Sequence, residues 1–244
     1  EQLGLRPNML LAAALHTRHA TTTAHRHRSA SPAANDMAAL DWDGYHAASA
    51  SEEWLMPHET FLRHALRHDR LGRVPRDGLV LELGCGTSSV AAALSDAGFR
   101  DVLGLDLSAR AVADAKARHA SRPGLRFARA DARALCSPAS SSSASSSSIV
   151  AGSVAAVLDK GTLDAICCGE GFDWEAGRVA ASLVRALRPG GVWVCASLMP
   201  PSVVLPLVSR AEWSLAAEPV PEAPRLTIYT GVLDGGGGAS VDAG

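Results

Sequence analysis

The chain has 244 residues, of which 47% are hydrophobic, and a formal net charge of −2. This length and composition are sufficient for one domain with a substantial core, and the balanced charge lacks the basic excess typical of proteins that bind nucleic acid. No apolar run approaches the roughly 20 residues that a bilayer-spanning helix needs. We therefore expect neither nucleic acid nor a membrane among the partners.

The first 37 residues differ in composition from the rest. No acidic residue occurs between residues 2 and 35, and arginines alternate there with alanine, threonine, serine and four histidines. This pattern is typical of an organelle transit peptide; the alternatives are a disordered leader or an over-extended gene model that really starts at Met9 or Met37. We therefore treat residues 1–37 as a disordered or transit-like leader, and expect a cytoplasmic protein, or a mitochondrial or plastid one if the leader is a transit peptide.

Aromatic residues gather where the structured part of the chain is expected to begin. Trp42 and Tyr45 lie in the run 41–45 and Trp54 in the run 53–55, and a helical apolar pattern follows over residues 61–66. Two interpretations stay open: these rings fold over a ligand as a cap, or they pack the helix onto a sheet.

The most informative segment is residues 79–87, LVLELGCGT, followed about 20 residues later by VLGLDLS at 102–108. The first apolar run predicts a buried parallel strand, and Gly84 and Gly86 allow a sharp turn that comes close to a ligand. A crossover helix is expected over 88–97, and a second strand over 102–107. Asp106, near the end of that second strand, is placed to accept hydrogen bonds from ribose hydroxyls, so an adenosine-containing cofactor is predicted.

The glycine pattern also bears on which cofactor binds. A dinucleotide fold uses G-x-G-x-x-G/A, whereas the third glycine is missing here. Glu82 would place a negative charge at the mouth of the loop, which would repel a pyrophosphate and suit a ligand that carries a sulfonium and an ammonium. These features favour S-adenosylmethionine over a nicotinamide dinucleotide.

Further elements complete an α/β sheet of seven strands. The apolar patterns predict a helix over 110–119, strands over 125–130, 154–158 and 192–196, a helix over 174–187 and a short helix over 203–211. Segments 212–217 and 226–233 are expected to form an antiparallel pair. The tract 137–148 is nearly all serine and alanine, so a surface loop is expected there.

The run E-x-G-x-G-T, the acidic residue after the second strand and LRPGG at 187–191 together resemble the Rossmann-like, seven-strand S-adenosylmethionine-dependent methyltransferases. The resemblance implies a methyltransferase domain over residues 38–234, with helices on both faces of the sheet and an antiparallel final strand. Composition, and not the resemblance, predicts the loop insertion at 137–148 and a flexible glycine-rich tail at 235–244. The resemblance also implies that Asp131 meets the adenine amino group and the Ala132 amide a ring nitrogen; the alternative for Asp131 is an ordinary helix cap. The implied cofactor-binding set is Glu82, Gly84, Cys85, Gly86, Thr87, Asp106, Leu107, Asp131, Ala132, Asp159 and Tyr45, with no metal.

The run DKGTLD at 159–164 resembles that of a subgroup of protein-lysine methyltransferases, including those of elongation factor 1-alpha and mitochondrial citrate synthase. The likeness extends from the aromatic segment at 41–45 to Leu233, and it implies a protein acceptor that bears a target lysine. The chain departs from the subgroup in its serine-rich insertion, its leader and its one methyltransferase domain where some relatives carry two.

Asp159 is the expected catalytic residue. An acceptor lysine must lose its proton before it attacks the methyl group, and a carboxylate nearby would orient the ammonium or assist deprotonation through water. Lys160 and Thr162 are expected to shape the pocket. The alternative is that Asp159 and Lys160 form a structural ion pair.

Three classes of function remain. The first is a protein-lysine methyltransferase, with a small-molecule methyltransferase as the alternative within the same chemistry. The distant alternatives are a nicotinamide-dependent oxidoreductase and a degenerate cofactor-binding module without turnover. The missing glycine, Glu82 and the Asp159 run argue against the oxidoreductase, whereas the intact Gly84, Gly86, Asp106 and Asp131 argue against degeneracy. The five cysteines lack metal-ligand spacing, and we expect reduced thiols without a chemical role.

Overall fold

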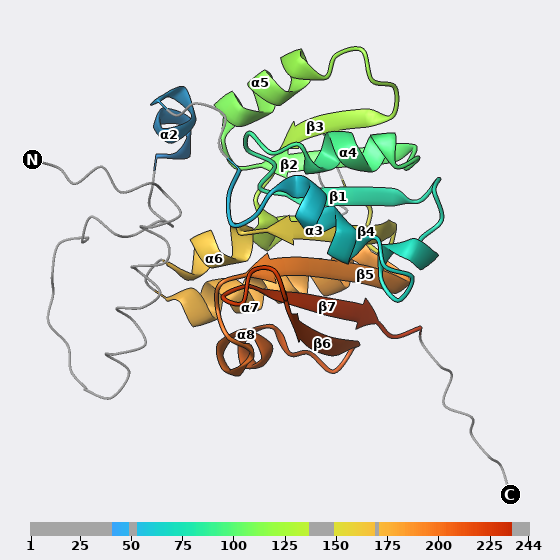
Figure 1. The fold of residues 1–244 in the computed structure, drawn as a ribbon, viewed down its shortest axis with the longest axis vertical. Helices are drawn as coiled ribbons and strands as arrows, with labels where there is room; N and C mark the ends of the chain where they lie inside the picture. Colours follow the sequence, from blue (N-terminus) through green and yellow to red (C-terminus); the bar gives the residue numbers. More distant parts are fainter. Residues whose placement is uncertain (1–40, 49–52, 137–148, 169–170, 236–244) are drawn as a thin grey trace, which may run out of the picture.

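The computed structural model describes residues 41–48, 53–136, 149–168 and 171–235 (Figure 1). The expectations for the leader, for the serine-rich tract 137–148 and for the tail beyond residue 235 lie outside these residues. Within them, no helix combines the length and apolarity needed to cross a membrane.

Seven strands form one sheet in the order β3-β2-β1-β4-β5-β7-β6 (Figure 1). The first five strands along the chain run parallel, whereas β7 is antiparallel to both β5 and β6. The predicted seven-strand sheet and its antiparallel end are therefore confirmed. The strand bounds are β1 Leu79–Leu83, β2 Asp101–Asp106, β3 Leu125–Arg129, β4 Val154–Lys160, β5 Leu187–Ser197, β6 Trp213–Pro219 and β7 Thr227–Leu233.

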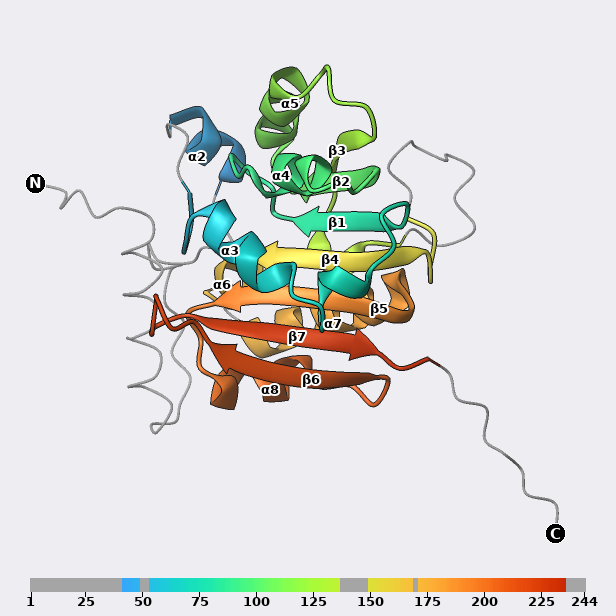
Figure 2. The same cartoon turned by 45° about the vertical axis from the view of Figure 1, so that its right-hand side comes forward.

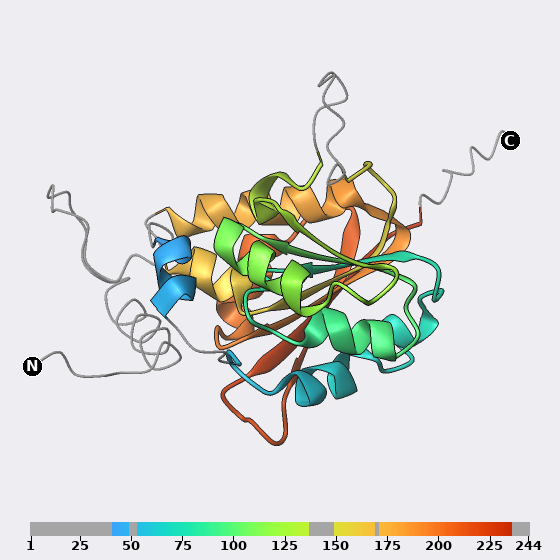
Figure 3. The same cartoon turned by 90° about the horizontal axis from the view of Figure 1, so that it is seen from above.

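Helices cover both faces of the sheet, as predicted. Seen from above, the helices drawn in yellow and orange lie on one side and those in cyan and green on the other (Figure 3). The strand residues alternate between two buried cores: Leu81 and Leu83 of β1 belong to the core beneath α6–α8, and Val80 to the core beneath α3–α5. The helix bounds are α2 Trp42–Ala48, α3 His58–Ala65, α4 Val90–Asp96, α5 Ala109–Arg118, α6 Thr162–Cys167, α7 Phe172–Ala186 and α8 Pro201–Val208, with short 3-10 turns η2 Leu71–Arg73 and η3 Ala132–Ala134.

The position of the site follows from the strand order. β1 pairs with β2 on one side and with β4 on the other, so the winding of the chain reverses direction between β1 and β4. In open parallel sheets the connections diverge at such a point and leave a crevice at the carboxyl ends of the strands. The short helix α2 lies beyond these carboxyl ends (Figure 2).

In the parallel part of the sheet, two strand bounds differ from the prediction by two residues or more. β4 continues to Lys160, two residues past the predicted end, because Asp159 and Lys160 still pair with Cys195 and Ala196 of β5. β5 begins at Leu187, which pairs with Val154 at the other end of β4. Because of the first difference, Asp159, the predicted catalytic residue, lies within β4 and not after its end.

Candidate functional site

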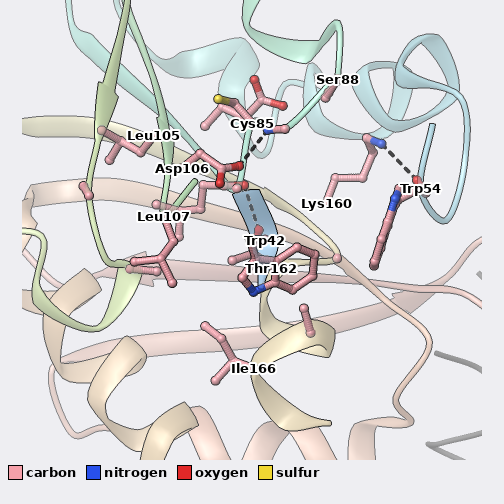
Figure 4. A pocket seen from close by; sticks show the side chains of 18 of the residues that line it. Trp42, Trp54, Cys85, Ser88, Leu105, Asp106, Leu107, Lys160, Thr162 and Ile166 are labelled. Atoms are coloured by element: carbon pink, nitrogen blue, oxygen red, sulfur yellow. Dashed lines mark hydrogen bonds between the residues drawn. The ribbon is translucent and has the colours of Figure 1, made fainter. Parts of the chain in front are cut away.

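A pocket opens at the carboxyl ends of β1, β2 and β4, where the strand order reverses (Figure 4). Five segments contribute its walls: the N-terminal aromatic segment, the glycine turn after β1, the end of β2, the turn after β3 and the β4–α6 turn. The lining residues are Trp42, His46, Trp54, 82–88, 105–107, 130–133, 160–162, Ala165 and Ile166.

The glycine turn adopts the conformation that its sequence predicts. Gly84 and Gly86 have φ values of 59° and 42°, in the left-handed region that favours glycine. A Cβ on Gly84 would run into the hydroxyl of Thr162, which donates a hydrogen bond to the Leu83 carbonyl at 2.8 Å. A Cβ on Gly86 would lie 3.2 Å from Cε1 of His46 and 3.9 Å from Oδ2 of Asp106. The turn therefore presents bare backbone to the pocket.

Asp106 is fixed at the end of β2 by two backbone donors. Its Oδ2 accepts from the Gly86 amide and its Oδ1 from the Ser108 amide, both at 2.8 Å. Burial raises the pKa of this carboxyl, while the two amides oppose the shift. Because a carboxylate has about four acceptor positions, capacity remains for the hydroxyls of a ligand. Asp106 and the adjacent Leu107 line the pocket, as predicted.

Glu82 lines the pocket, but its carboxyl is buried beneath the glycine turn and does not stand at the loop mouth. Its Oε2 accepts from the Ala91 amide at 2.9 Å, and only 2% of the residue is exposed. Burial raises its pKa to about 7, against hydrogen bonding from Ser88 and the positive charge of Lys160. The structure thus corrects the electrostatic argument from Glu82: this group anchors the start of α4 and is partly protonated near neutral pH.

Asp131 and Ala132 line the pocket on the side of β3. Asp131 also caps the turn η3, because its Oδ1 accepts from the Arg133 amide at 2.9 Å, and it forms an ion pair with the Arg133 side chain at 2.7 Å. Burial tends to raise the pKa of Asp131, but the bonds from Arg133 lower it overall. Asp131 therefore both caps a helical turn and lines the pocket, so the two roles are not exclusive. Its contact with adenine stays a prediction.

Asp159 lies outside the pocket lining, which corrects the expectation of a carboxylate beside the reacting methyl. The residue is completely buried, and its Oδ1 accepts from the amides of Thr162 and Leu163 at 2.9 and 3.3 Å. Because β4 is two residues longer than predicted, strand alternation turns Asp159 into the core and Lys160 toward the pocket. Asp159 therefore fixes the β4–α6 turn from beneath.

The alternative interpretation, an ion pair between Asp159 and Lys160, is not found among the described residues either. The Lys160 ammonium instead contacts Oε2 of Glu53 at 2.6 Å. It also donates to the Trp54 carbonyl at 2.9 Å (Figure 4). Oε1 of Glu53 contacts Nδ1 of His58 at 3.1 Å. These bonds hold the N-terminal segment against the end of β4.

A second buried carboxyl lies close to Asp159. Asp164 of α6 is completely buried, and its Oδ1 accepts from the Leu198 amide at 2.9 Å. Burial raises the pKa of each carboxyl to about 7, and repulsion from Asp164 adds to the shift at Asp159. Within the described part of the chain, Oδ2 of neither residue has a hydrogen-bond partner. The pair holds α6 between the turn after β4 and the turn after β5.

The N-terminal aromatic residues divide between the two roles that the sequence left open. Trp42 and Trp54 line the pocket, whereas Tyr45 lies behind them with its ring edge-on to both. The predicted place of Tyr45 in the pocket wall is taken by His46, because residues four apart share one face of α2 and Trp42 fixes which face turns inward. The sequence analysis missed His46; the helical spacing from Trp42 was the signal that would have found it.

The comparisons with known proteins agree with this site. Residues 80–151 match the family model described as "Methyltransferase domain". Over 146 residues the chain is 34% identical to "EEF1A lysine methyltransferase 4" of Mus musculus, covering 56% of this chain and 52% of that protein. It is 36% identical over 131 residues to "eEF1A lysine and N-terminal methyltransferase" of Danio rerio, covering 53% of this chain and 17% of that protein.

The chain thus spans about half the length of the first of these relatives and much less of the second. A solved structure from work on the conversion of a disulfide bond into a thioacetal group during echinomycin biosynthesis superposes with a TM-score of 0.56 at 19% identity. The superposition covers 81% of this chain and 92% of the chain in that structure. At this identity the likeness shows that the two chains share a fold. The predicted resemblance to seven-strand methyltransferases is confirmed.

We predict that Asp164→Asn makes stability less dependent on pH. The folded pKa values near 7 lie above the ordinary value of 3.8, so the folded protein keeps protons that the unfolded chain releases as pH rises from about 4 to about 7. The free energy of unfolding therefore falls across this window. Asparagine does not ionise and removes the repulsion on Asp159, so the fall should be shallower.

Urea unfolding at several pH values across this window measures the slope. The exposed Asp77, whose side chain is 72% accessible, provides the matched control Asp77→Asn. Equal slopes in the two variants would contradict a shifted buried pair.

Proposed function

We propose that this chain is an S-adenosylmethionine-dependent methyltransferase that acts on a lysine side chain of a protein. The observation that carries the proposal is the pocket at the switch in strand order, in which the turn formed by two left-handed glycines donates the Gly86 amide to the Asp106 carboxylate. The match to a methyltransferase domain begins at Val80, in the strand that leads into this turn.

The residues of the pocket fit the proposed cofactor. A Cβ on Gly86 would enter the space between His46 and Asp106, so the bare glycine leaves room there for a ligand, and Asp106 offers acceptors for two neighbouring hydroxyls. Leu107 and Ile166 supply apolar surface of the kind that an adenine ring requires. When bound, the cofactor would supply an electrophilic methyl group on a positively charged sulfur.

The contribution of the protein to such a reaction is alignment. Trp42 and Trp54 cover one side of the pocket and exclude water, while the rigid turns after β1 and β4 fix the remaining walls. Holding a nucleophile in line with an electrophile converts a bimolecular reaction into an effectively unimolecular one. In well-aligned cases this lowers the activation barrier by up to about 7–11 kcal/mol. No covalent intermediate on the enzyme is needed.

Asp159 acts in this scheme as a positioning residue. Its carboxyl caps the start of α6 and thereby places Gly161 and Thr162 in the pocket wall. The acceptor lysine must react as the neutral amine, and the apolar rings of Trp42 and Trp54 that line the pocket disfavour its charged form.

The choice of a protein lysine as acceptor is supported by the relatives and by the DKGTLD run at 159–164. The proteins matched at 34% and 36% identity are named as eEF1A lysine methyltransferases, and eEF1A is therefore the first acceptor to test. A small-molecule acceptor is the alternative that the same experiment distinguishes.

We predict that Asp106→Ala weakens binding of S-adenosylhomocysteine by about tenfold to a hundredfold, because hydrogen bonds to a charged group contribute about 1.5–3 kcal/mol. Isothermal titration calorimetry measures the affinity. Asp101→Asn changes a carboxylate at the opposite end of β2, where it pairs with Arg126, and should leave binding unchanged. Equal affinity of Asp106→Ala and wild type would exclude the assigned pocket.

The position of Asp159 generates a second prediction. Asp159→Asn keeps an oxygen that can accept from the Thr162 amide, so turnover should stay within about threefold of wild type, whereas Asp159→Leu leaves two buried amides unsatisfied and should lower stability by about 1–3 kcal/mol. Steady-state rates and thermal unfolding measure the two effects. A loss of turnover in Asp159→Asn with normal cofactor binding would restore the direct catalytic role.

The activity itself is tested with tritiated S-adenosylmethionine, the full chain, purified eEF1A and a cell extract, with Asp106→Ala as the inactive control. We expect label in eEF1A or another discrete protein that survives hydrolysis as methyl-lysine. Label only in small molecules would favour the alternative acceptor class. Cofactor binding without transfer to any acceptor would identify a module without turnover.

A further inference from the structure

Three large hydrophobic side chains are exposed in the described part of the chain, and one of them is a tryptophan. They are Leu107, Val150 and Trp174, and Trp174 is the most exposed of the three at 71%. Leu107 lines the pocket. Val150 lies near the other end of α7, where the Gly152 amide bonds the Arg185 carbonyl. Because single exposed apolar residues are ordinary on protein surfaces, the position of Trp174 decides what it indicates.

Trp174 lies in the first turn of α7, close to the rim of the pocket. The next residue, Glu175, accepts a hydrogen bond from Arg133 at 3.0 Å, and Arg133 lines the pocket. Seen from above, α6 and the beginning of α7, in yellow, lie at the same end of the molecule as α2, in blue (Figure 3). Trp174 is therefore an exposed aromatic side chain beside the entrance to the proposed active site.

The segment around Trp174 is acidic. The sequence has carboxylates at positions 164, 170, 173 and 175 and no lysine, arginine or histidine from 161 to 177. Of these carboxylates, Asp164 is buried, and Glu175 is engaged by Arg133 and by Arg178 at 3.5 Å. Asp173, by contrast, is exposed directly next to Trp174. An indole and a carboxylate thus stand side by side in sequence on an exposed turn.

This pair of side chains suits a basic partner. The face of an indole attracts the ammonium of a lysine or the guanidinium of an arginine, and a carboxylate nearby adds a charge of the opposite sign. Tryptophan is also among the residues that contribute most to binding where two proteins meet. A protein whose lysine side chain enters the pocket must bring its own surface against the rim, so Trp174 and Asp173 lie where such a surface arrives.

We propose that Trp174 and Asp173 form a docking site for a basic segment of the acceptor protein next to its target lysine, a proposal that rests on the proposed function. A lysine or arginine of that segment stacks on the indole and pairs with the Asp173 carboxylate, while the target lysine reaches into the pocket. Neither residue lines the pocket, so the docking site acts on the choice of acceptor and leaves cofactor binding unchanged.

The test measures KM and kcat of the full chain for purified eEF1A, or for the protein that the labelled cell extract identifies, at saturating S-adenosylmethionine. Trp174→Ala should raise KM by about fivefold to thirtyfold with kcat nearly unchanged, as expected for an aromatic residue central to an interface. Asp173→Lys should raise KM more than Asp173→Asn, because it adds a repulsive charge.

Two controls separate docking from other effects. Val150→Ala removes an exposed apolar side chain at the far end of α7 and should leave KM unchanged. The affinity of every variant for S-adenosylhomocysteine, measured by isothermal titration calorimetry, should equal that of the wild type.

Each outcome decides the assignment. A wild type that methylates a protein while Trp174→Ala keeps the same KM rejects the docking site alone. A weaker affinity of Trp174→Ala for S-adenosylhomocysteine would show a structural role and also overturn it, and equal KM values for Asp173→Lys and Asp173→Asn would exclude a basic segment as the partner. A wild type that binds S-adenosylhomocysteine but labels no protein contradicts the proposed protein acceptor, and the docking site fails with it.

Discussion

The hydrogen bond from the Gly86 amide to the Asp106 carboxylate joins the turn after β1 to the end of β2, and the geometry of the pocket depends on it. It forms because β1 and β2 run parallel in register, with Leu83 opposite Leu105, and because the Cys85 amide bonds the Leu105 carbonyl directly before the turn. The left-handed glycines then let the backbone turn sharply at the crevice without a side chain entering it. One side of the pocket thus follows from two adjacent strands.

The opposite side depends on buried carboxyls. Asp159 and Asp164 fix α6 from below, and the Thr162 hydroxyl connects the start of that helix to the Leu83 carbonyl. Lys160 continues this side to the N-terminal segment through Glu53 and the Trp54 carbonyl. Each wall is held by polar groups removed from water, a costly arrangement that is found more often at functional sites than in ordinary cores.

The features that the sequence predicts correctly are those encoded locally. Gly84 and Gly86 mark a turn because other residues resist positive φ, and Asp106 marks a strand end because it follows an apolar run. The errors arise where a shift of one residue along a strand or helix decides whether a side chain points into the pocket or away from it. β4 extends through Asp159 and Lys160 because of its pairing with β5, which reverses the direction expected for Asp159. On α2, the position of Trp42 and the docking of Asp43 onto Ser108 and Arg110 turn His46, and not Tyr45, toward the pocket.

The buried carboxyls also connect stability to the proposed chemistry. Glu82, Asp159 and Asp164 all have pKa values near 7 through burial, so the stability of the elements around the pocket falls as pH rises from about 4 to about 7. A lysine acceptor has an ordinary pKa of about 10.4, so the same rise in pH increases the fraction of neutral, reactive amine. Higher pH thus favours the nucleophile while it weakens the scaffold that aligns it. In the proposed reaction, desolvation of the acceptor amine against the rings of Trp42 and Trp54, which line the pocket, would lower the pKa of the lysine locally, so that methyl transfer could proceed at a pH where the buried pair still holds a proton.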